Sequence, residues 1–351
     1  MPIGLDIGSS AVRVAELQRR RNAPPRLQRY GTVALPPGAV VDGDVLEPTV
    51  VADAVRQLWR DVGLRGRDVA VGLASQRVTV RQMDLPELPD AELADAVRLQ
   101  AQDELAIAVD DALLDYVVVG RPSTAAGERS QLCRVLLVAA EKEMVERLLA
   151  AVTAAKLRPV LVDLDAFAVL RSLAGLMDTG EDAGLVVDIG ATVTKIAVHR
   201  DGHPLFVRMV RLGGDAVTRQ LQTVLELSWE DAEKAKLDAS AAMVIGHELD
   251  PEDERAIALK KGVQRVVTEI GHSLDFFRSH HPNVDVGEVV LCGGASLAPE
   301  LVDELHAALE LPVERPQLLP SIDASGRGEA ELDKERSSLA VPVGLAMALL
   351  P

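Results

Sequence analysis

The most informative pattern of apolar and polar positions in this chain occurs twice. Residues 5–15 (Leu-Asp-Ile-Gly-Ser-Ser-Ala-Val-Arg-Val-Ala) and residues 187–197 (Val-Asp-Ile-Gly-Ala-Thr-Val-Thr-Lys-Ile-Ala) match position by position. Each copy has an apolar strand, an Asp-x-Gly turn with small residues and a second alternating strand, which predicts a β-hairpin. Two such hairpins half a chain apart predict a duplicated fold with two similar lobes.

Between the two hairpins, the pattern predicts alternating helices and strands. Val51, Ala54, Leu58 and Val62 follow helical spacing, which predicts a helix over 48–62. Further strands are expected at 68–74, 78–85, 114–120, 131–139 and 159–162, and further helices at 90–104 and 142–156. The order strand, helix, strand, strand, helix predicts a compact α+β unit that interrupts the first lobe.

The second half continues the alternation. Strands are expected within 186–198 and at 205–212 and 288–291, and helices from 213, at 229–238 and over about 251–277. The polar stretch 317–337 is expected to be a loop. We therefore predict an α/β chain with the first half of lobe 1 at 1–75, the inserted unit at 76–159, the connecting helix and the end of lobe 1 at 160–178, and lobe 2 at 179–351 with a smaller helical subdomain at about 215–285.

Composition limits the classes of partner. The 351 residues include 54 acidic and 37 basic side chains, for a formal net charge of −17. A net negative surface argues against nucleic-acid binding and against a broad electrostatic grip on anionic lipid. Aromatic residues make up only 2% of the chain. The core must therefore be built from Ala, Val and Leu.

Three further features indicate a cytoplasmic protein without direct membrane insertion. Cys133 and Cys292 both lie in apolar runs and are too few for a disulfide framework or a four-cysteine zinc site. No charged leader precedes an apolar stretch at the N-terminus, so no signal peptide is expected. The longest apolar run, residues 339–350, is too short to span a bilayer.

The two hairpin turns carry the candidate chemistry. Glycine in such a turn lets backbone N–H groups approach an anion, and neighbouring hydroxyl groups at Ser9, Ser10 and Thr192 can donate to phosphate oxygens. Asp6 and Asp188 each end a first strand and are placed to hold the waters around Mg²⁺. One hairpin alone is equally consistent with an ordinary structural hairpin. The repeat and the Gly293-Gly294 turn after an apolar strand favour a phosphate site.

These residues resemble the actin-like ATPases, and within them the PilM family of type IV pilus assembly. The resemblance covers essentially the whole chain. It is carried by residues 4–17, 162–168 (Val-Asp-Leu-Asp-Ala-Phe-Ala), 212–215 (Leu-Gly-Gly-Asp), 232–236 (Ala-Glu-Lys-Ala-Lys) and 342–346 (Pro-Val-Gly-Leu-Ala). It implies an actin-like two-lobed fold with duplicated ribonuclease-H-like lobes and an inserted α+β subdomain, binding ATP or ADP with Mg²⁺.

The resemblance also assigns roles to particular positions. It implies that Gly8, Ser9, Ser10 and Arg13 meet the β/γ-phosphates, opposed by Gly190, Ala191 and Thr192, with Gly213 and Gly214 beside them. It implies that Glu233 and Lys236 bind the ribose and that Gly293, Gly294 and Ala295 back the adenosine. The alternatives are an exposed helix with paired charges for Glu233 and Lys236, and a plain strand-to-helix turn for Gly213 and Gly214.

Two departures bear on catalysis. Arg13 stands where most relatives have lysine, and a guanidinium is bulkier and forked. Asp163 stands where chaperone relatives have a catalytic glutamate, so it is the candidate catalytic residue, with helix capping as its alternative role. A carboxylate one methylene shorter can leave ATP bound but hardly cleaved, because phosphoryl transfer depends on positioning. We expect at most weak ATPase activity.

The implied function is a nucleotide-binding scaffold of the pilus inner-membrane platform. The resemblance implies that a groove between the inserted unit and the first lobe accepts the N-terminal cytoplasmic tail of a PilN-like membrane protein, with other platform proteins and self-association as further partners. The protein would then be cytoplasmic and peripheral to the inner face of the membrane. The alternatives are an FtsA-like division protein, disfavoured because no basic amphipathic segment follows the last helix, and a small-molecule kinase.

Overall fold

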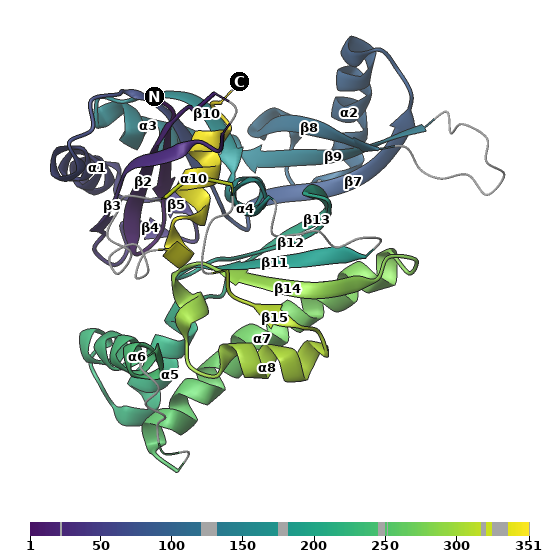
Figure 1. The fold of residues 1–351 in the computed structure, drawn as a ribbon. Coiled ribbons are helices and arrows are strands. Elements are labelled where there is room, and N and C mark those ends of the chain that lie inside the picture. The colour runs from purple at the N-terminus through teal and green to yellow at the C-terminus, as the bar shows by residue number, and fades with distance from the viewer. Residues whose placement is uncertain are drawn as a thin grey trace.

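Two five-stranded sheets with the same strand order form the two lobes of the computed structural model (Figure 1). The structure describes residues 1–21, 23–120, 132–174, 182–244, 250, 252–316, 321–324 and 336–350. The expected loop at 317–337 therefore lies largely outside the described residues. The first sheet has the order β10-β6-β1-β2-β3 and the second the order β15-β14-β11-β12-β13.

The repeated hairpins are the centre of each sheet. The first hairpin is β1 (Ile3–Ile7) and β2 (Ala11–Gln18), and the second is β11 (Ala183–Ile189) and β12 (Thr194–Arg200). In both sheets the hairpin adds an antiparallel strand on one side and two parallel strands on the other. The predicted duplication is thus visible in the strand order and direction.

The other strands of the two sheets complete this pattern. In the first sheet they are β3 (Arg26–Ala34), β6 (Asp68–Leu73) and β10 (Arg158–Leu164). In the second they are β13 (His203–Val210), β14 (Val286–Cys292) and β15 (Val313–Glu314). A two-stranded hairpin of β4 (Val40–Val41) and β5 (Asp44–Val45) stands beside the first sheet.

The inserted unit is a three-stranded antiparallel sheet covered on one face by a helix. Its strands are β7 (Val78–Pro86), β8 (Ala112–Gly120) and β9 (Leu132–Glu141), and its helix is α2 (Asp90–Glu104). The next helix, α3 (Lys142–Ala154), leaves this unit and packs with α1 (Pro48–Val62) in the core of the first lobe. Figure 1 shows the three strands projecting sideways from the first lobe.

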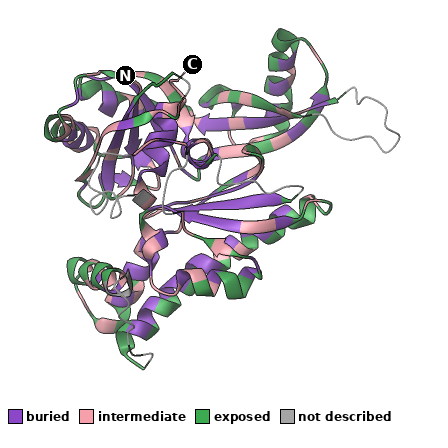
Figure 2. Ribbon diagram, in the orientation of Figure 1, coloured by how far each residue is buried: buried purple, intermediate pink, exposed green. Residues whose placement is uncertain are grey.

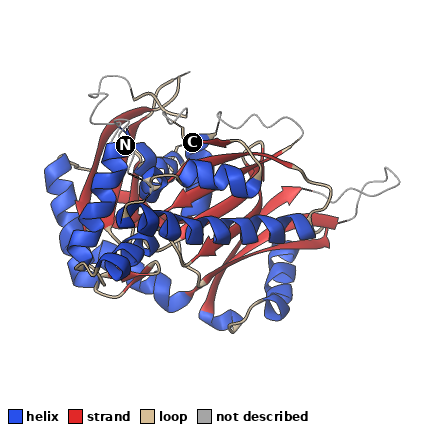
Figure 3. Ribbon diagram, turned by 90° about the horizontal axis from the view of Figure 1, so that it is seen from below, coloured by secondary structure: helices blue, strands red, loops and turns tan. Residues whose placement is uncertain are grey.

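Helices cover the sheets according to their apolar faces. The second lobe carries α5 (Gly214–Leu225), α6 (Trp229–Val244), α7 (Glu254–His280) and α8 (Leu301–Leu309). Figure 3, seen from below, shows these helices in front of the second sheet. The apolar stripe expected on the long helix is buried, with Leu259, Val263, Ile270 and Leu274 in the core. No helix of the described residues is long and apolar enough to cross a membrane.

The two lobes share one apolar layer. The helices α4 (Asp165–Leu173) and α10 (Ala340–Met347) pack together between the two sheets, and this layer appears buried in Figure 2. We expected residues 179–351 to belong to lobe 2, but α10 instead contacts β1, β2 and α4 of the first lobe. An all-apolar helix is suited to this place because it is covered on every side.

Candidate functional site

A cleft of about 1340 Å³ lies between the two lobes, where the turns of both hairpins meet. Its lining brings together residues far apart in the sequence. Of the predicted positions it includes Asp6, Gly8, Ser9, Ser10, Arg13, Asp188, Gly190, Ala191, Thr192, Gly214, Glu233, Lys236, Gly293, Gly294 and Ala295. Gly213 and Asp163 are not part of this lining.

Each hairpin sets a cation against its own aspartate. The strand register pairs Asp6 with Arg13 and Asp188 with Lys195. Arg13 Nη1 lies 3.4 Å from Asp6 Oδ2, and Lys195 Nζ lies 2.9 Å from Asp188 Oδ2. Sequence reasoning did not assign Lys195 to the site. The repeat itself held the signal, because Lys195 stands at the position that Arg13 occupies in the first copy.

The two turns touch across the cleft. Ser9 Oγ and Thr192 Oγ1, one from each lobe, share a hydrogen bond of 2.5 Å. Both hydroxyl groups therefore face the same small volume, together with the backbone of Gly8 and Gly190. This is the arrangement that two opposed phosphate-binding turns require.

The carboxylate that this part of the first lobe presents to the cleft is Asp165, not Asp163. Asp163 Oδ2 accepts from Arg171 Nη2 at 2.9 Å, and Asp163 Oδ1 accepts from the Leu164 backbone N–H at 2.8 Å. Asp165 is only 4% exposed and lines the cleft, and its Oδ1 atom has no hydrogen-bond partner in the described structure. Asp163 lies in β10, which ends at Leu164, and Asp165 begins α4. The sequence alone did not indicate which of the two carboxylates points toward the cleft.

Lys195 is the centre of a buried charge cluster. Its Nζ lies 3.6 Å from Asp165 Oδ2 as well as 2.9 Å from Asp188 Oδ2. Burial raises the pKa of Asp165 to about 7, although Lys195 opposes this and Asp6 and Asp188 add to it. Burial also raises the pKa of Asp6, although the charges of Arg13 and Lys195 lower it in part. Burial would lower the pKa of Lys195, but Asp188, Asp165 and Asp6 together raise it.

The carboxylates of this cluster fit an indirect contact with a metal ion. No group of three or more His, Cys, Asp or Glu side chains is placed to hold a metal directly in the part of the chain that is described. The carboxylates of Asp6, Asp165 and Asp188 line the cleft and can accept hydrogen bonds from metal-bound water. Residues of this kind fit Mg²⁺ held through its water shell.

The helix α5 supports the second turn from behind. The Gly214 N–H donates to Gly190 O at 2.9 Å, and the Asp215 N–H donates to Ala191 O at 2.9 Å. A Cβ atom at Gly213 would lie 2.4 Å from Gly190 O. Gly213 therefore lets the helix start approach the turn closely, which explains its position just outside the lining.

Glu233 and Lys236 form one polar group on the cleft side of α6. Lys236 Nζ lies 2.7 Å from Glu233 Oε2 and donates to Thr218 Oγ1 at 2.8 Å. Thr218 Oγ1 in turn donates to Glu233 Oε2. Thr218 is fully buried, and sequence reasoning missed it because nothing in its neighbourhood marks it. Both α6 residues line the cleft, so they are more than an exposed pair of charges.

The Gly293-Gly294 turn also lines the cleft. Gly293 has a φ of 87°, and a Cβ atom there would lie 2.2 Å from Asp188 Oδ1. The turn is followed by Ala295 and Ser296, whose Oγ donates to Gly293 O at 2.7 Å. Arg315, which sequence reasoning missed, lines the cleft as well and donates from Nη1 to Ser296 O at 3.3 Å. Apolar lining comes from Leu237, Val302 and Val313.

Together, these walls suit a polyanionic ligand with an apolar part. The lining combines backbone turns, hydroxyl groups and the cations Arg13, Lys195 and Lys236 with apolar side chains. A nucleotide carries both kinds of group, a phosphate chain and a base.

A family model described as type IV pilus assembly protein PilM matches residues 4–349. The cell division protein FtsA of Streptococcus pneumoniae is 24% identical over 338 residues, covering 86% of this chain and 72% of that protein.

Two solved structures are also similar to this chain. The chain is similar to a chain of a PilM-PilN type IV pilus biogenesis complex, with a TM-score of 0.85, 26% identity, and coverage of 99% of this chain and 98% of that one. MreB 5 of Spiroplasma citri bound to AMPPNP has a TM-score of 0.54 and 11% identity, with coverage of 99% and 95%. The second likeness shows the fold alone. Both confirm the expected actin-like two-lobed fold.

Proposed function

Because this chain belongs to the PilM family of type IV pilus assembly proteins, we propose that it is a nucleotide-binding scaffold of the pilus inner-membrane platform. ATP or ADP would occupy the cleft between the lobes, and a PilN-like cytoplasmic tail would dock on the first lobe. The observation that carries this proposal is the convergence of both glycine turns, the Glu233–Lys236 pair and the Gly293-Gly294 turn on one cleft.

The phosphates would lie between the two turns. A phosphate chain there would replace the Ser9–Thr192 hydrogen bond with contacts to both hydroxyl groups and to backbone N–H groups. Arg13 and Lys195 supply positive charge on either side. Because the two hydroxyl groups come from different lobes, occupancy of this position would set the distance between the lobes.

The nucleoside would lie toward the second lobe. Glu233 and Lys236 are placed to contact the ribose, and Gly293, Gly294 and Ala295 to contact the adenosine, with Leu237 and Val313 as apolar lining. Gly294 has open space where a Cβ atom would stand, so a ligand can approach its backbone closely.

Mg²⁺ would supply charge neutralisation at the phosphates and would be held through water by Asp6, Asp188 and Asp165. Any hydrolysis would depend on Asp165 rather than Asp163, because Asp165 lines the cleft and Asp163 does not. Its raised pKa leaves it partly protonated at neutral pH, which weakens it as a base. We therefore propose at most weak ATPase activity.

The edge strand β10 is the proposed docking position for the tail. It is the outermost strand of the first sheet on the side of the inserted unit (Figure 1). Val160 and Val162 alternate on its surface and are 48% and 36% exposed. An extended peptide can add to such an edge through main-chain hydrogen bonds while apolar side chains set its register. Similarity to a PilM chain of a PilM-PilN complex supports a tail of that kind as the ligand.

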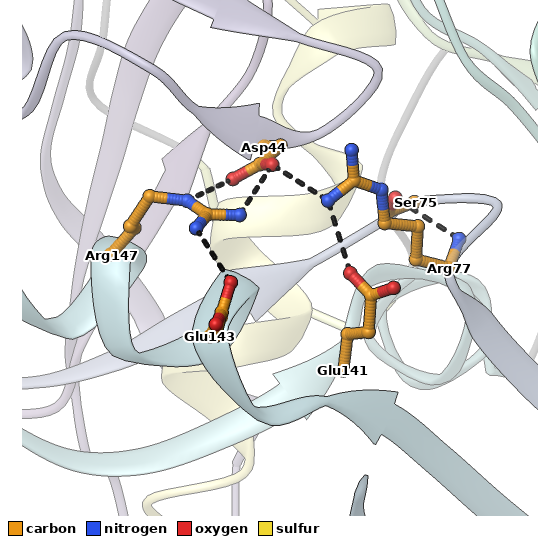
Figure 4. Close-up of polar contacts among 6 residues, drawn as sticks. All are labelled: Asp44, Ser75, Arg77, Glu141, Glu143 and Arg147. Atoms are coloured by element: carbon orange, nitrogen blue, oxygen red, sulfur yellow. Dashed lines mark hydrogen bonds and ion pairs between the residues drawn. The ribbon is translucent and has the colours of Figure 1, made fainter. Parts of the chain in front are cut away.

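The small β4–β5 hairpin connects the cleft to the inserted unit. At its turn, Asp42 forms an ion pair of 2.9 Å with Arg211 of the second lobe, and the next residue, Gly43, lines the cleft. On its other side, the buried Asp44 accepts two hydrogen bonds from Arg147 of α3, at 2.8 and 2.7 Å, and one from Arg77 at 3.0 Å. Figure 4 shows both arginines directed at Asp44.

This connection provides a route for coupling. Arg77 stands just before β7 of the inserted unit and also bonds Glu141 at the end of β9, at 3.0 Å. A change in the distance between the lobes would act on Asp42, and through Asp44 on both ends of the inserted unit. We propose that nucleotide state reaches the tail-docking position by this path, as a shift between two populations of lobe angle.

Binding of the tail peptide tests the proposal. A fluorescent peptide of a PilN-like N-terminal tail is titrated with the full chain, nucleotide-free, with ADP, and with ATP plus Mg²⁺. We expect saturable binding whose affinity differs between nucleotide states, and loss of binding in Val160→Lys/Val162→Lys. Val224→Lys, an exposed valine on α5 of the other lobe, is the matched control and keeps wild-type affinity. Equal affinity in all nucleotide states contradicts the coupling, and absence of binding contradicts the docking.

Other platform proteins and self-association are further proposed partners, and a position at the cytoplasmic face of the membrane follows from the proposed tail. An FtsA-like role in division is the alternative, supported by the 24% identity to the Streptococcus protein. The family match over residues 4–349 and the TM-score of 0.85 favour the pilus role.

A further inference from the structure

One edge of the first sheet is basic although the protein as a whole is strongly acidic. Eight basic side chains stand where its strands begin or end on the side away from the cleft. This basic rim consists of Arg19, Arg20, Arg21, Arg26, Arg65, Arg67, Lys156 and Arg158. All eight are exposed. They are eight of the 37 basic residues of a chain whose formal net charge is −17.

The sheet register places these residues side by side. Arg158 is opposite Asp68, immediately after Arg67, and β6 runs parallel to β1 with Gly4 opposite Ala70. On the other side of β1, β2 ends at Gln18 opposite Arg26. In the sheet order β10-β6-β1-β2-β3, the N-terminal strand β1 is central, and basic residues therefore flank it on both sides at this edge. Five strands span about 19 Å.

The loops that carry the rim are held in place. The Arg158 N–H donates to Arg67 O at 2.7 Å, and Trp59 Nε1 donates to Gly66 O at 2.9 Å, which fixes the loop between Arg65 and Arg67. The Leu17 N–H donates to Pro2 O at 3.0 Å and ties the end of β2 to the N-terminus. Figure 1 shows both chain ends and the start of β10 on this outer side of the first lobe.

Only part of this charge is neutralised within the protein. Arg158 pairs with Asp68, and Arg20 pairs with Asp323. In the part of the chain that the structure describes, Arg19, Arg21, Arg65, Arg67 and Lys156 make no ion pair.

We propose that the basic rim is a surface for anionic lipid headgroups, which orients the protein with its first sheet edge toward the membrane. A charge of −17 repels the rest of the molecule from an anionic bilayer, so attraction at one edge fixes the orientation as well as the contact. The rim also continues into β10, where a membrane protein's tail is proposed to dock.

The net charge of −17 opposes a broad contact of the protein with anionic lipid, but the rim is a local contact. Anionic headgroups attract each nearby Lys or Arg, and the attraction falls off within a Debye length, so distant carboxylates on the second lobe oppose it little. The preference for a membrane over another polyanion rests on the proposed function. The vesicle test below contains no peptide or nucleotide, so its outcome is independent of the tail-binding test.

Vesicle flotation with the full chain tests the rim. The probes are vesicles of phosphatidylcholine alone and of phosphatidylcholine with phosphatidylglycerol, at low and at high salt. We expect flotation only with the anionic vesicles and at low salt. Arg19→Ser/Arg21→Ser should reduce the partition coefficient about 30-fold, and Arg65→Ser/Arg67→Ser should act in the same direction from a separate loop. Thermal unfolding confirms that each variant folds.

The matched control is Arg265→Ser/Arg278→Ser, which makes the same change in net charge on exposed positions of α7 in the second lobe. It should leave flotation unchanged or slightly improved. Equal loss in the control and rim variants overturns the proposal, as does failure to float with anionic vesicles at low salt. Binding of a short DNA duplex by the rim, without binding of anionic vesicles, would assign the surface to nucleic acid instead.

Discussion

Lys195 Nζ lies 2.9 Å from Asp188 Oδ2, and in the other lobe Arg13 stands beside Asp6 at the same register position. The duplicated hairpins have thus kept one charge arrangement in two copies, with different cations. The two copies face one cleft, so their hairpin turns oppose each other. Lys195 differs from Arg13 in also lying 3.6 Å from Asp165, which makes it the shared counter-ion of the site.

Removing this counter-ion should destabilise the fold. Lys195→Met leaves the buried carboxylates without their shared cation, and we expect a loss of about 3 kcal/mol in the free energy of unfolding. The double variant Lys195→Met/Asp188→Asn should recover a large part of that loss, because one uncompensated charge is removed. Urea unfolding at neutral pH measures both. A double variant as unstable as the single one would show that packing, not charge, dominates.

The pH dependence of stability reports on Asp165. The pKa of Asp165 is about 7 in the folded protein, above its ordinary value of 3.8. Between these values the folded state binds more protons than the unfolded state, so the free energy of unfolding contributed by this group falls as pH rises from about 4 to 7. Asp165→Asn removes this dependence. The free energy of unfolding of the variant, relative to that of wild type, should therefore increase as pH rises from about 5 to 8, by on the order of 2–4 kcal/mol.

Unfolding curves at several pH values for both proteins make the comparison. Asp163→Asn is the matched control, since Asp163 is half-buried against Arg171 and outside the cleft lining. An equal pH dependence in wild type and Asp165→Asn would contradict the burial of an ionisable carboxyl at this position.

Two adjacent glycines should respond differently to the same change. Gly293→Ala places a methyl group against Asp188 at a φ of 87°, and we expect a loss of about 1–3 kcal/mol. Gly294→Ala meets no atom within 4 Å and should leave stability nearly unchanged. Its methyl group would instead stand in the space proposed for adenosine and weaken nucleotide binding. Thermal unfolding and a nucleotide titration of both variants separate the two effects; similar stability losses in both would refute the assignment.

The ion pair between Asp42 and Arg211 should matter for coupling more than for stability. Arg211 is 65% exposed at its side chain, and exposed pairs contribute 0 to about 1 kcal/mol. Arg211→Ser should therefore leave the unfolding free energy nearly unchanged, but reduce the difference in tail affinity between nucleotide states. Arg208→Ser, on the strand β13 that ends just before Arg211, controls for the charge change. An unchanged nucleotide effect in Arg211→Ser would exclude this route.

The elements that the sequence predicted well are those with one buried face. The helix expected at 48–62 has those bounds in the structure, and the hairpins and inserted strands lie where their alternation placed them. The strand β3 was not anticipated, because its residues are mostly half-buried and show no clean alternation. The apolar run near the C-terminus indicated burial but not a partner, so α10 was assigned to the wrong lobe.

In the site, the glycine turns could be found from local sequence, but the contacts between distant segments could not. Asp165 and Thr218 acquire their positions only when α4 and α5 pack against the hairpins. The basic rim illustrates the same limit for charge. Arg19, Arg65 and Lys156 are remote in sequence, and only the strand order of the first sheet brings them to one edge.

Nucleotide binding in the cleft is the central proposed property of the protein. The decisive measurement is a calorimetric titration of the nucleotide-free protein with ATP plus Mg²⁺, repeated with Gly294→Ala. We predict saturable binding at one site per chain, weakened by the methyl group at Gly294, with little heat continuing after saturation. Sustained heat of hydrolysis that disappears in Asp165→Asn would make the protein an ATPase. No binding by protein shown to carry no retained nucleotide would contradict the assignment of the cleft.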